Sequence, residues 1–524
     1  MPCTQQAQAV LPGDVIDLHG KWRADKPALM CGQESRSWAA FAAATSQLAN
    51  GLIKLGVQHG DNVLVLMDNG IAMAETLFGI IRSGGVAAPM NPAISQEALA
   101  VLCADCAPRA VFASAGHAAR LEKVRANGGL EHVLPGAFIV DGGTPAPDWQ
   151  GYEPWRHEQP ADNPKAGVKP DDPCNIIYSS GTTGVPKGIV HSHKCRMSWA
   201  SDLGLALRYH EGARTLCSLG LYSNISWAAM LPTMLCGGTV VIMEKFDTGV
   251  CLNLIEQERI SHTAMVPVQF QRLFADSAFA HTDISSLQAV MACGSPMSAD
   301  EKCGIAARLG CAFIELYGLT EGVITILPPE DMQDHAQSVG RPLQGSDLVI
   351  LDAGDVPCPV GEIGQICGYG PLLMSGYHNN SQATRDTGWT DSEGRFWVRT
   401  GDLGRLDENG FLHLAGRNKD MIISGGQNIY PVDLETVLAM HPDVQDCAVL
   451  GVNSRKWGET PLALVTIRAG ARVEGKDLLE WMNTRLGKQQ RAAALIIIDE
   501  LPRNPNGKIL KNELRKRYKD IVHD

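Results

Sequence analysis

The chain has 524 residues, of which 45% are hydrophobic and 19% are charged. This length exceeds what one hydrophobic core usually serves, and the composition is that of a folded protein, so two or more domains are expected. A formal net charge of −12 argues against nucleic acid or an anionic membrane surface as the main partner. The first residues lack signal-peptide character and no stretch reaches the length of a membrane span, so we expect a cytoplasmic protein.

Two pairs of potential metal or redox ligands need an interpretation. Cys103 and Cys106 form a C-x-x-C pair, but apolar residues flank it and no second pair lies nearby. His191 and His193 are close together without a cluster of carboxylates or thiols. We therefore favour packing roles for both pairs over metal or redox roles. The 15 cysteines are scattered and odd in number, which favours reduced thiols over a disulfide framework.

Predicted helices and strands alternate along the first part of the chain. Apolar residues at helical spacing predict a helix over residues 38–55 that ends at Gly56, and a strand is expected at 63–67. A second helix at 72–82 then precedes a strand at 86–89. This alternation predicts parallel strand pairs in an α/β arrangement. Further strands of the same kind are expected at residues 238–243, 263–267 and 287–292.

The pattern changes in two places. Residues 141–172 are rich in Pro, Gly, Asp and Trp and have little periodicity, so we expect an irregular connector there. Beyond residue 416 a compact alternation begins, with a helix expected at 431–440 and strands at 448–452 and 495–498. The fold predicted is α/β: a large N-terminal domain of layered α/β subdomains over residues 1–416, a link at 417–420, and a small α+β domain over 421–524.

A loop rich in glycine and hydroxyl groups is the strongest functional signal. Residues 178–188 read Tyr-Ser-Ser-Gly-Thr-Thr-Gly-Val-Pro-Lys-Gly and lie between two apolar, strand-like segments. Such a loop can bind phosphate through inward backbone N–H groups, hydroxyl donors and the Lys187 charge. It is not a Walker loop, because Lys187 is followed by glycine. The candidate phosphate ligands are Ser179, Ser180, Gly181, Thr182, Thr183, Gly184 and Lys187.

Three later segments carry further candidate groups. Residues 315–321 read Glu-Leu-Tyr-Gly-Leu-Thr-Glu, in which Tyr317 offers a flat ring and Glu321 offers oxygen ligands suited to Mg²⁺. Asp402 and Arg417 follow in Thr-Gly-Asp and Gly-Arg-x-Lys-Asp patterns, and together they can bind the two hydroxyls of a ribose. Near the end of the chain, Pro-Asn-Gly-Lys-Ile forms a restricted loop that presents Lys508 outward. Read singly, these segments are a strand end, a surface ion pair and a solvated tail.

Taken together and in this order, these motifs resemble those of the adenylate-forming superfamily: acyl-CoA synthetases (AMP-forming acid–CoA ligases), peptide-synthetase adenylation domains and luciferases. The resemblance runs from about Trp38 to Leu510. It implies that residues 1–416 form the adenylation domain and that 421–524 form a mobile lid, which swings about Lys419 in the 417–420 hinge. The catalytic residues implied are Lys508, Thr183, Glu321 and Lys187. The ATP and AMP ligands implied, beyond the phosphate loop, are Gly294, Ser295, Pro296, Glu315, Tyr317, Gly318, Thr320, Asp402, Arg417 and Lys508.

The same resemblance implies a reaction and its co-substrates. It predicts an ATP-dependent ligase that forms an acyl-adenylate and then an acyl-CoA thioester, releasing AMP and pyrophosphate. Mg²⁺ is expected at Glu321, and coenzyme A is expected to pass Gly425 and Gly426. The partners are a small carboxylic acid, ATP and CoA, with no nucleic acid, and a homodimer is left open. No carrier-protein serine motif follows, which favours a free-standing enzyme.

The substrate follows from where the chain departs from the family. Many relatives have Pro-Leu-Tyr/Phe-His where this chain has Gly-Leu-Tyr-Ser at residues 220–223. The acyl pocket implied is lined by Tyr222, Ser223, Asn224 and Trp227. Its polarity favours a small to medium acid, polar and functionalised or aromatic, and Leu316 stands where malonate-specific relatives carry Arg. The alternatives are an enzyme that loads a separate carrier protein and a nucleotide-binding pseudoenzyme; the motifs do not support an oxygen-dependent luciferase.

Overall fold

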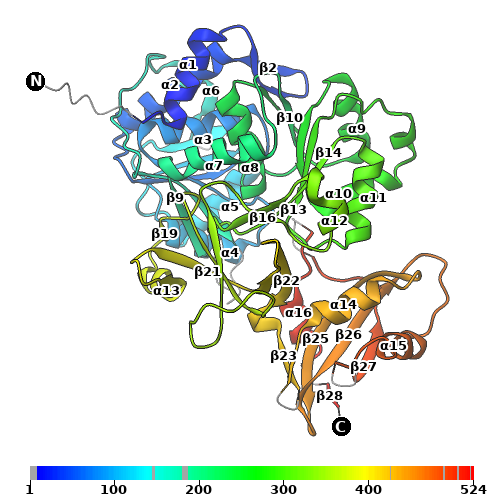
Figure 1. Cartoon of the computed structure of the whole chain (residues 1–524). Coiled ribbons are helices and arrows are strands. Elements are labelled where there is room, and N and C mark those ends of the chain that lie inside the picture. The colour runs from blue at the N-terminus through cyan, green and yellow to red at the C-terminus, as the bar shows by residue number, and fades with distance from the viewer. Residues whose placement is uncertain are drawn as a thin grey trace, which may run out of the picture.

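The computed structural model describes residues 9–143, 148–179, 187–424, 427–487, 490–503, 507–519 and 521–523. Sheets and helices of the first 420 residues are stacked in layers, and the last hundred residues form a separate body beside them (Figure 1). Within the described residues, no helix has both the length and the apolar character that a membrane crossing requires.

One large sheet is mostly parallel, with antiparallel strands at its two edges. Its strands run in the order β16-β15-β14-β13-β12-β10-β11-β1-β2. The strands are β1 (Pro27–Cys31), β2 (Glu34–Ser37), β10 (Arg214–Cys217), β11 (Thr239–Ile242), β12 (His262–Met265), β13 (Ala289–Cys293), β14 (Ala312–Gly318), β15 (Ile324–Leu327) and β16 (Arg341–Pro342). The parallel strands are joined by helices, as parallel pairing requires.

A second large sheet has the same character. Its order is β19-β9-β8-β4-β3-β5-β6-β7, and only β8–β9 and β9–β19 are antiparallel pairs. The strands are β3 (Asn62–Leu66), β4 (Val86–Pro89), β5 (Ala110–Ser114), β6 (Phe138–Asp141), β7 (Gln150–Gly151), β8 (Pro173–Ser179), β9 (Lys187–Ser192) and β19 (Gly376–Tyr377). The alternation of side chains along β3 sends Val63 and Val65 into one core and Leu64 and Leu66 into another.

Helices fill the space between the two sheets and cover their outer faces. One core joins both sheets to the helices α1 (Pro12–Trp22), α2 (Trp38–Leu55), α3 (Ile71–Ser83), α6 (Tyr152–His157), α7 (His193–Ala206) and α8 (Asn224–Cys236). The outer helices are α4 (Gln96–Cys106) and α5 (Ala115–Ala126) on the second sheet, and α9 (Thr248–Gln257), α10 (Pro267–Ala275), 3-10 helix η1 (Ser277–His281), α11 (Ala299–Leu309) and α12 (Pro329–His335) on the first.

An antiparallel sheet follows in the chain and carries two of the predicted nucleotide ligands. Its strands are β17 (Asp347–Leu351), β18 (Gly364–Tyr369), β20 (Gly388–Thr390), β21 (Phe396–Leu406) and β22 (Leu412–Arg417), with α13 (Ser381–Asp386) beside them. Strands β21 and β22 form a hairpin in which Asp402 pairs directly with Arg417. The hairpin therefore places these two residues opposite each other on neighbouring strands.

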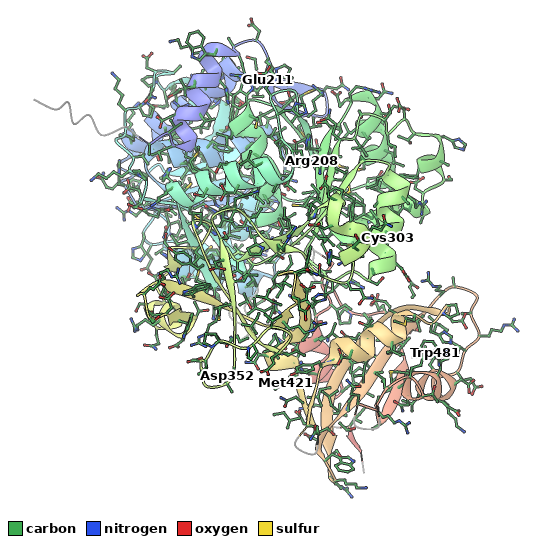
Figure 2. The ribbon with its side chains drawn as sticks, in the orientation of Figure 1. Arg208, Glu211, Cys303, Asp352, Met421 and Trp481 are labelled. Carbon is green, nitrogen blue, oxygen red and sulfur yellow. The ribbon has the colours of Figure 1, made fainter. Side chains whose placement is uncertain are left out.

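The last sheet belongs to the C-terminal body. Its elements are β23 (Ile422–Ser424), β24 (Gln427–Ile429), α14 (Pro431–Ala439), β25 (Val444–Ser454), β26 (Gly458–Ile467), α15 (Gly475–Asn483), β27 (Ala494–Ile497), α16 (Lys511–Arg517) and β28 (Val522–His523). The 3-10 helix η2 (Asn418–Asp420) links it to β22. Figure 2 shows Met421 at this passage, where the yellow ribbon becomes orange.

Most elements predicted from the sequence are confirmed. The helix at 38–55 has the predicted bounds: the Ser37 hydroxyl accepts from the Ala40 N–H at its start, and Gly56 ends it with φ 97°. The predicted α/β class is confirmed. The irregular connector at 141–172 is wrong in part, because β7 and α6 lie within it. Tyr152 and Trp155 of α6 are buried, so tertiary packing stabilises a helix too short to show periodicity.

A buried ion pair lies beneath β14. The Lys302 ammonium on α11 lies 2.5 Å from the Glu315 carboxylate, and both side chains are almost fully buried. Lys302 also donates to the backbone oxygens of Ala336 and Ser338, each at 2.8 Å. Burial raises the pKa of Glu315 to about 7, and Lys302 opposes this shift. The pair therefore depends on both partners, because either charge alone would be left in an apolar interior.

We expect Lys302→Met to lower the free energy of unfolding by about 3–5 kcal/mol, because it leaves the Glu315 carboxylate buried without its counter-charge. Urea unfolding followed by circular dichroism measures the change. Lys54→Met at an exposed position of α2 is the matched control and should change stability by less than about 0.5 kcal/mol. The double variant Lys302→Met/Glu315→Leu should recover much of the loss; a double variant no more stable than Lys302→Met would contradict this account.

Candidate active site

The predicted phosphate loop joins two antiparallel strands. β8 ends at Ser179 and β9 begins at Lys187, and these two residues are paired across the ladder. The flanking strands predicted from the sequence are therefore confirmed. The loop residues Ser180, Gly181, Thr182, Thr183 and Gly184 lie outside the described residues, so their roles stay predictions.

Tyr377 connects Lys187 with Glu321. The Tyr377 hydroxyl donates a 2.8 Å hydrogen bond to Oε1 of Glu321. The Lys187 ammonium lies 4.8 Å from the centroid of the Tyr377 ring, within cation–π range. Burial and the Glu321 charge raise the pKa of Tyr377, so its hydroxyl remains a donor. The ring thus holds a cation on its face and a carboxylate at its hydroxyl.

The environment of Glu321 suits a magnesium ion. The described residues contain no group of three or more His, Cys, Asp or Glu side chains that could hold a metal by themselves. Mg²⁺ commonly takes one or two protein carboxylates and completes its shell with substrate phosphates and water. Glu321 provides one such carboxylate next to the strand that carries Lys187. The residue that follows is constrained: a Cβ on Gly322, at φ 102°, would lie 1.9 Å from the Leu372 carbonyl oxygen.

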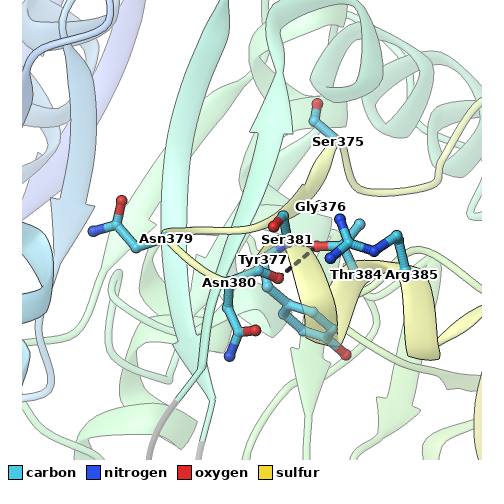
Figure 3. Close-up of a pocket in the computed structure, with 8 residues that line it drawn as sticks. All are labelled: Ser375, Gly376, Tyr377, Asn379, Asn380, Ser381, Thr384 and Arg385. Carbon is cyan, nitrogen blue, oxygen red and sulfur yellow. Dashed lines mark hydrogen bonds between the residues drawn. The ribbon is translucent and has the colours of Figure 1, made fainter.

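A shallow cavity of about 630 Å³ lies against Tyr377 (Figure 3). It is lined by Ser375, Gly376, Tyr377, Asn379, Asn380, Ser381, Thr384 and Arg385. The Thr384 hydroxyl accepts from the Tyr377 backbone N–H at 2.9 Å, which fixes the strand β19 against α13. The described lining residues are polar and include the Arg385 cation but no carboxylate, so this hollow extends the polar surface beside Glu321.

Asp402 is the centre of a three-residue cluster. Its Oδ2 accepts a 2.8 Å hydrogen bond from the Tyr317 hydroxyl, and its Oδ1 lies 3.1 Å from Nε of Arg417. The Asp402 side chain is 10% exposed and that of Arg417 is 27% exposed. Burial and the Asp402 charge raise the pKa of Tyr317 well above its usual value. The structure thus brings together the three residues predicted to bind the nucleoside, from two different sheets.

The segment predicted to contact adenine lies at the carboxyl end of β13. A Cβ on Gly294, at φ 95°, would lie 3.2 Å from Val266 and 3.4 Å from Ile225, so α8 and the start of α10 approach it closely. The Ser295 hydroxyl is buried and has no hydrogen-bond partner among the described residues. Pro296 is exposed. A buried hydroxyl without a partner costs free energy, which fits a segment that completes its hydrogen bonds with a ligand.

The remaining residues of the 315–321 motif have different surroundings. Thr320 is partly exposed, and its carbonyl oxygen accepts a 2.7 Å hydrogen bond from Nε2 of His191. Gly318 is exposed, and a Cβ there would lie 2.9 Å from the Val323 carbonyl oxygen. The Glu315 side chain faces Lys302 in the interior. A contact of Glu315 with nucleotide stays a prediction, and its observed role is to support β14.

Lys508 approaches the Asp402 cluster from the C-terminal body. Burial lowers the pKa of Lys508 to about 8, the Arg417 and Lys419 charges add to this shift, and Asp402 opposes it. The preceding Gly507 has φ 78°, and a Cβ there would lie 2.9 Å from Val268 of α10. The loop therefore rests against the N-terminal domain, with Lys508 in the electrostatic range of the predicted ribose ligands.

The link between the two bodies is anchored on both sides. Arg417 belongs to β22 and pairs with Asp402, whereas Asp420 accepts a 2.6 Å hydrogen bond from Arg515 of α16. Lys419 lies between these anchors in η2, and burial lowers its pKa. A hinge at Lys419 stays a prediction. Gly425 and Gly426, predicted to face CoA, lie outside the described residues.

The predicted acyl element forms the start of α8. Ser223 is the residue before the helix, and its hydroxyl accepts from the Ile225 N–H. Tyr222, Asn224 and Ile225 are partly exposed, whereas Trp227 is fully buried and donates from its indole N–H to the Leu221 carbonyl. Trp227 therefore supports the helix from behind and presents no surface of its own.

Other polar residues at the site were not predicted. Arg196 is fully buried on α7 and donates to Asn175, Asn224 and His191. The sequence carries no motif for these contacts; the one signal is a set of polar residues within otherwise apolar segments, at Asn175 and His191. The two potential metal pairs occupy the interior: Cys103 and Cys106 are buried on α4, and His193 is buried at the start of α7.

Comparison with known proteins identifies the family. The profile described as AMP-binding enzyme matches residues 18–378, and that of the AMP-binding enzyme C-terminal domain matches residues 433–508. The first match covers more than half of the chain. The chain therefore belongs to the AMP-binding enzymes of the adenylate-forming superfamily, and the resemblance inferred from its motifs is confirmed.

Several relatives match almost from end to end. The chain is 33% identical over 498 residues to a feruloyl-CoA synthase of an Amycolatopsis species, covering 94% of this chain and 96% of the relative. It is 31% identical over 508 residues to the indoleacetate–CoA ligase of Aromatoleum aromaticum, covering 96% and 97%. Among solved structures, ATP-bound MatB from Rhodopseudomonas palustris superposes with a TM-score of 0.87 at 27% identity, covering 98% and 99%.

We expect Asp402→Asn to weaken AMP binding about 10–100-fold. The change removes the negative charge beside Arg417 and replaces one acceptor oxygen by an NH2 group, which cannot accept the hydrogen bond from Tyr317 or Arg417. The proposed ribose site would thereby lose part of its structure. Isothermal titration calorimetry with AMP measures the affinity. Asp355→Asn is the matched control, because Asp355 forms an ion pair with Arg399 through a carboxylate that is 51% exposed. An unchanged AMP affinity in Asp402→Asn, or an equal loss in the control, would contradict the assignment.

Proposed function

We propose that this chain, an AMP-forming acid–CoA ligase, activates a small to medium carboxylic acid that is polar and functionalised or aromatic. The acid is first converted to an acyl-adenylate with release of pyrophosphate, and the acyl group is then transferred to the thiol of CoA with release of AMP. The approach of Lys508 to the Tyr317, Asp402 and Arg417 cluster carries the proposal. This arrangement brings the proposed catalytic cation of one domain within electrostatic range of the proposed ribose ligands of another.

Adenylation requires charge stabilisation at phosphate. A carboxylate oxygen of the acid attacks the α-phosphorus, and the bond to the bridging oxygen of pyrophosphate breaks. Negative charge grows on the phosphate oxygens, which Lys187, Lys508 and the hydroxyls of Thr182 and Thr183 would offset. Glu321, oriented by Tyr377, would hold Mg²⁺, which when bound supplies further positive charge to the phosphates.

Thioester formation needs a different arrangement. The CoA thiolate attacks the acyl carbonyl, and AMP leaves with the electron pair of the broken acyl–phosphate bond. We propose that the C-terminal domain turns about Lys419, which withdraws Lys508 and brings Gly425 and Gly426 to the site. The two anchors at Arg417 and Asp420 leave a short segment in which such a rotation can occur.

Two observations support a functionalised or aromatic acid. The start of α8 partly exposes Tyr222, Asn224 and Ile225, so an aromatic ring and an amide accompany one apolar side chain. Relatives of 31–33% identity are a feruloyl-CoA synthase and an indoleacetate–CoA ligase. A long-chain-fatty-acid–CoA ligase of Mycobacterium tuberculosis is also 31% identical. The polar residues of α8 favour the functionalised or aromatic class over the long-chain class.

The proposal is tested by acid-dependent exchange of labelled pyrophosphate into ATP over short, dicarboxylic, aromatic and fatty acids, followed by AMP release with CoA present. Exchange together with CoA-dependent AMP release is the expected result, with the highest kcat/KM for a functionalised or aromatic acid. Exchange without turnover of CoA would replace the ligase with an enzyme that loads a carrier protein. A long fatty acid as the best substrate would overturn the proposed acid class.

The pKa of Lys508 predicts how adenylation depends on pH. Because the pKa is lowered to about 8, the free enzyme loses this positive charge as the pH rises through that value. We therefore expect kcat/KM for ATP in the exchange reaction to fall above about pH 8, since this parameter reports groups of the free enzyme. Lys508→Arg keeps its charge throughout, so its lower activity should show no such fall. The same decline in Lys508→Arg and wild type would contradict the assignment to Lys508.

A further inference from the structure

Arg196 is a buried cation without a carboxylate partner among the described residues. Its side chain is fully inaccessible to solvent. Its three hydrogen bonds go to neutral acceptors: Nε to Oδ1 of Asn175 at 2.8 Å, one terminal nitrogen to Oδ1 of Asn224 at 3.0 Å, and the other to Nδ1 of His191 at 3.2 Å. Burial lowers the pKa of Arg196 to about 10, so the guanidinium stays charged at neutral pH. Such a charge is costly to bury, which calls for a function.

The direction of each hydrogen bond follows from the chemistry of the guanidinium. A guanidinium can only donate, so His191 must accept through Nδ1 and therefore donates its Nε2 proton to the Thr320 carbonyl at 2.7 Å. Burial and the Arg196 charge lower the pKa of His191 far below its usual value, which keeps this ring neutral. Arg196 thereby connects the strand before the phosphate loop, the 315–321 motif and helix α8.

The same rule sets the orientation of Asn224. Its Oδ1 must face Arg196, so its Nδ2 amide group is turned away from the guanidinium. Asn224 is partly exposed, and its Nδ2 has no hydrogen bond to another described residue. Because Oδ1 is held by a cation, the amide is polarised and its N–H groups become stronger donors. Asn224 is thus a preorganised donor that no described residue uses.

Asn224 lies at the end of α8 that is close to the proposed adenine segment. The next residue, Ile225, approaches Gly294 of the proposed adenine segment, as does Val266. Val266 and Val268 in turn lie against Gly507, which precedes Lys508. The start of α8, the adenine segment and the Lys508 loop therefore converge. A donor on this part of α8 would face the acyl portion of a bound adenylate.

We propose that Asn224, oriented by Arg196, donates a hydrogen bond to an oxygen acceptor on the acid, so that the enzyme selects oxygen-bearing acids over hydrocarbon acids of the same shape. Hydroxyl, alkoxy and carbonyl oxygens meet this requirement. Asn224 is the specificity residue and Arg196 is a positioning residue. The inference rests on the proposed ligase function and narrows its acid. An acid without the acceptor would leave a polarised donor buried and unpaired, which is how a polar site rejects an apolar analogue.

Asn224→Asp tests the donor without removing the partner of Arg196. The aspartate still accepts from the guanidinium, now as an ion pair, while an acceptor oxygen replaces the Nδ2 donor. The probes are acyl-sulfamoyl adenosines, stable mimics of the acyl-adenylate, prepared as matched pairs. Each pair differs by one substituent at one ring position of a benzoyl group. Hydroxyl is compared with hydrogen and with methyl, methoxy with ethyl, and acetyl with isopropenyl. Calorimetry measures the affinity of both members for each variant.

The wild type is expected to prefer the oxygen-bearing member of at least one pair about 10–100-fold, and Asn224→Asp is expected to abolish that preference with no loss of melting temperature. Asn253→Asp, the same change at an exposed position of α9, should leave the preference intact. Equal binding of both members of every pair by the wild type, or an unchanged preference in Asn224→Asp, would overturn this inference alone. Failure of every analogue to bind would overturn the adenylate-forming proposal as well.

The kinetic readout separates positioning from folding. Arg196→Lys should retain a buried cation but lose the three-way hydrogen bonding, so Asn224 would no longer be held in one orientation. The exchange reaction should then show a raised KM for the preferred oxygen-bearing acid and an unchanged KM for its hydrocarbon analogue. Equal changes in the KM values for the oxygen-bearing acid and for its hydrocarbon analogue would show that Arg196 acts only through stability. That result would overturn its positioning role.

Discussion

The carboxylate of Asp402 is the interaction on which the proposed site depends. It joins the first large sheet through Tyr317 to the antiparallel sheet through Arg417, and both contacts are at hydrogen-bond distance. Because the Asp402 side chain is 10% exposed, these contacts are less screened than surface ion pairs. The Lys508 loop of the last sheet rests beside the same cluster. Two sheets and the Lys508 loop therefore meet at one negative charge, the carboxylate that we propose as a ligand of the ribose.

The charge balance at this cluster bears on the proposed movement of the C-terminal domain. Arg417, Lys419 and Lys508 are three cations near the carboxylates of Asp402 and Asp420, and Asp420 is also paired with Arg515. Burial is the main cause of the lowered pKa of Lys508, and the Arg417 and Lys419 charges add to it. Phosphate groups would compensate it while ATP is bound, and their departure as pyrophosphate would restore the repulsion. In the proposed mechanism, the charges that favour the first half-reaction would also favour withdrawal of Lys508 after it.

A structural feature could be predicted from the sequence where it depends on residues that are close together in the chain. Helix α2 follows from apolar spacing and from Ser37 and Gly56, all of which are local. Tyr317, Asp402 and Lys508 were predicted as site residues because their neighbours form ordered motifs. The motifs do not show that these residues lie close together. Tyr377 and Arg196 were missed, since their partners lie on other elements of the fold. Tyr377 reaches Glu321, and Arg196 on α7 reaches Asn175 of β8 and Asn224 of α8. Contacts of this kind arise only when separate strands are packed together.

The buried cations Lys302 and Arg196 differ in the groups that surround their charges. Lys302 has a carboxylate partner and two backbone acceptors, so its interactions are completed within the protein. Arg196 has neutral acceptors and the faces of Trp199 and Trp227, at 5.2 and 4.9 Å, which offset only part of its desolvation. In the proposed site, the Arg196 charge serves to orient Asn224, the residue that we propose contacts the acid.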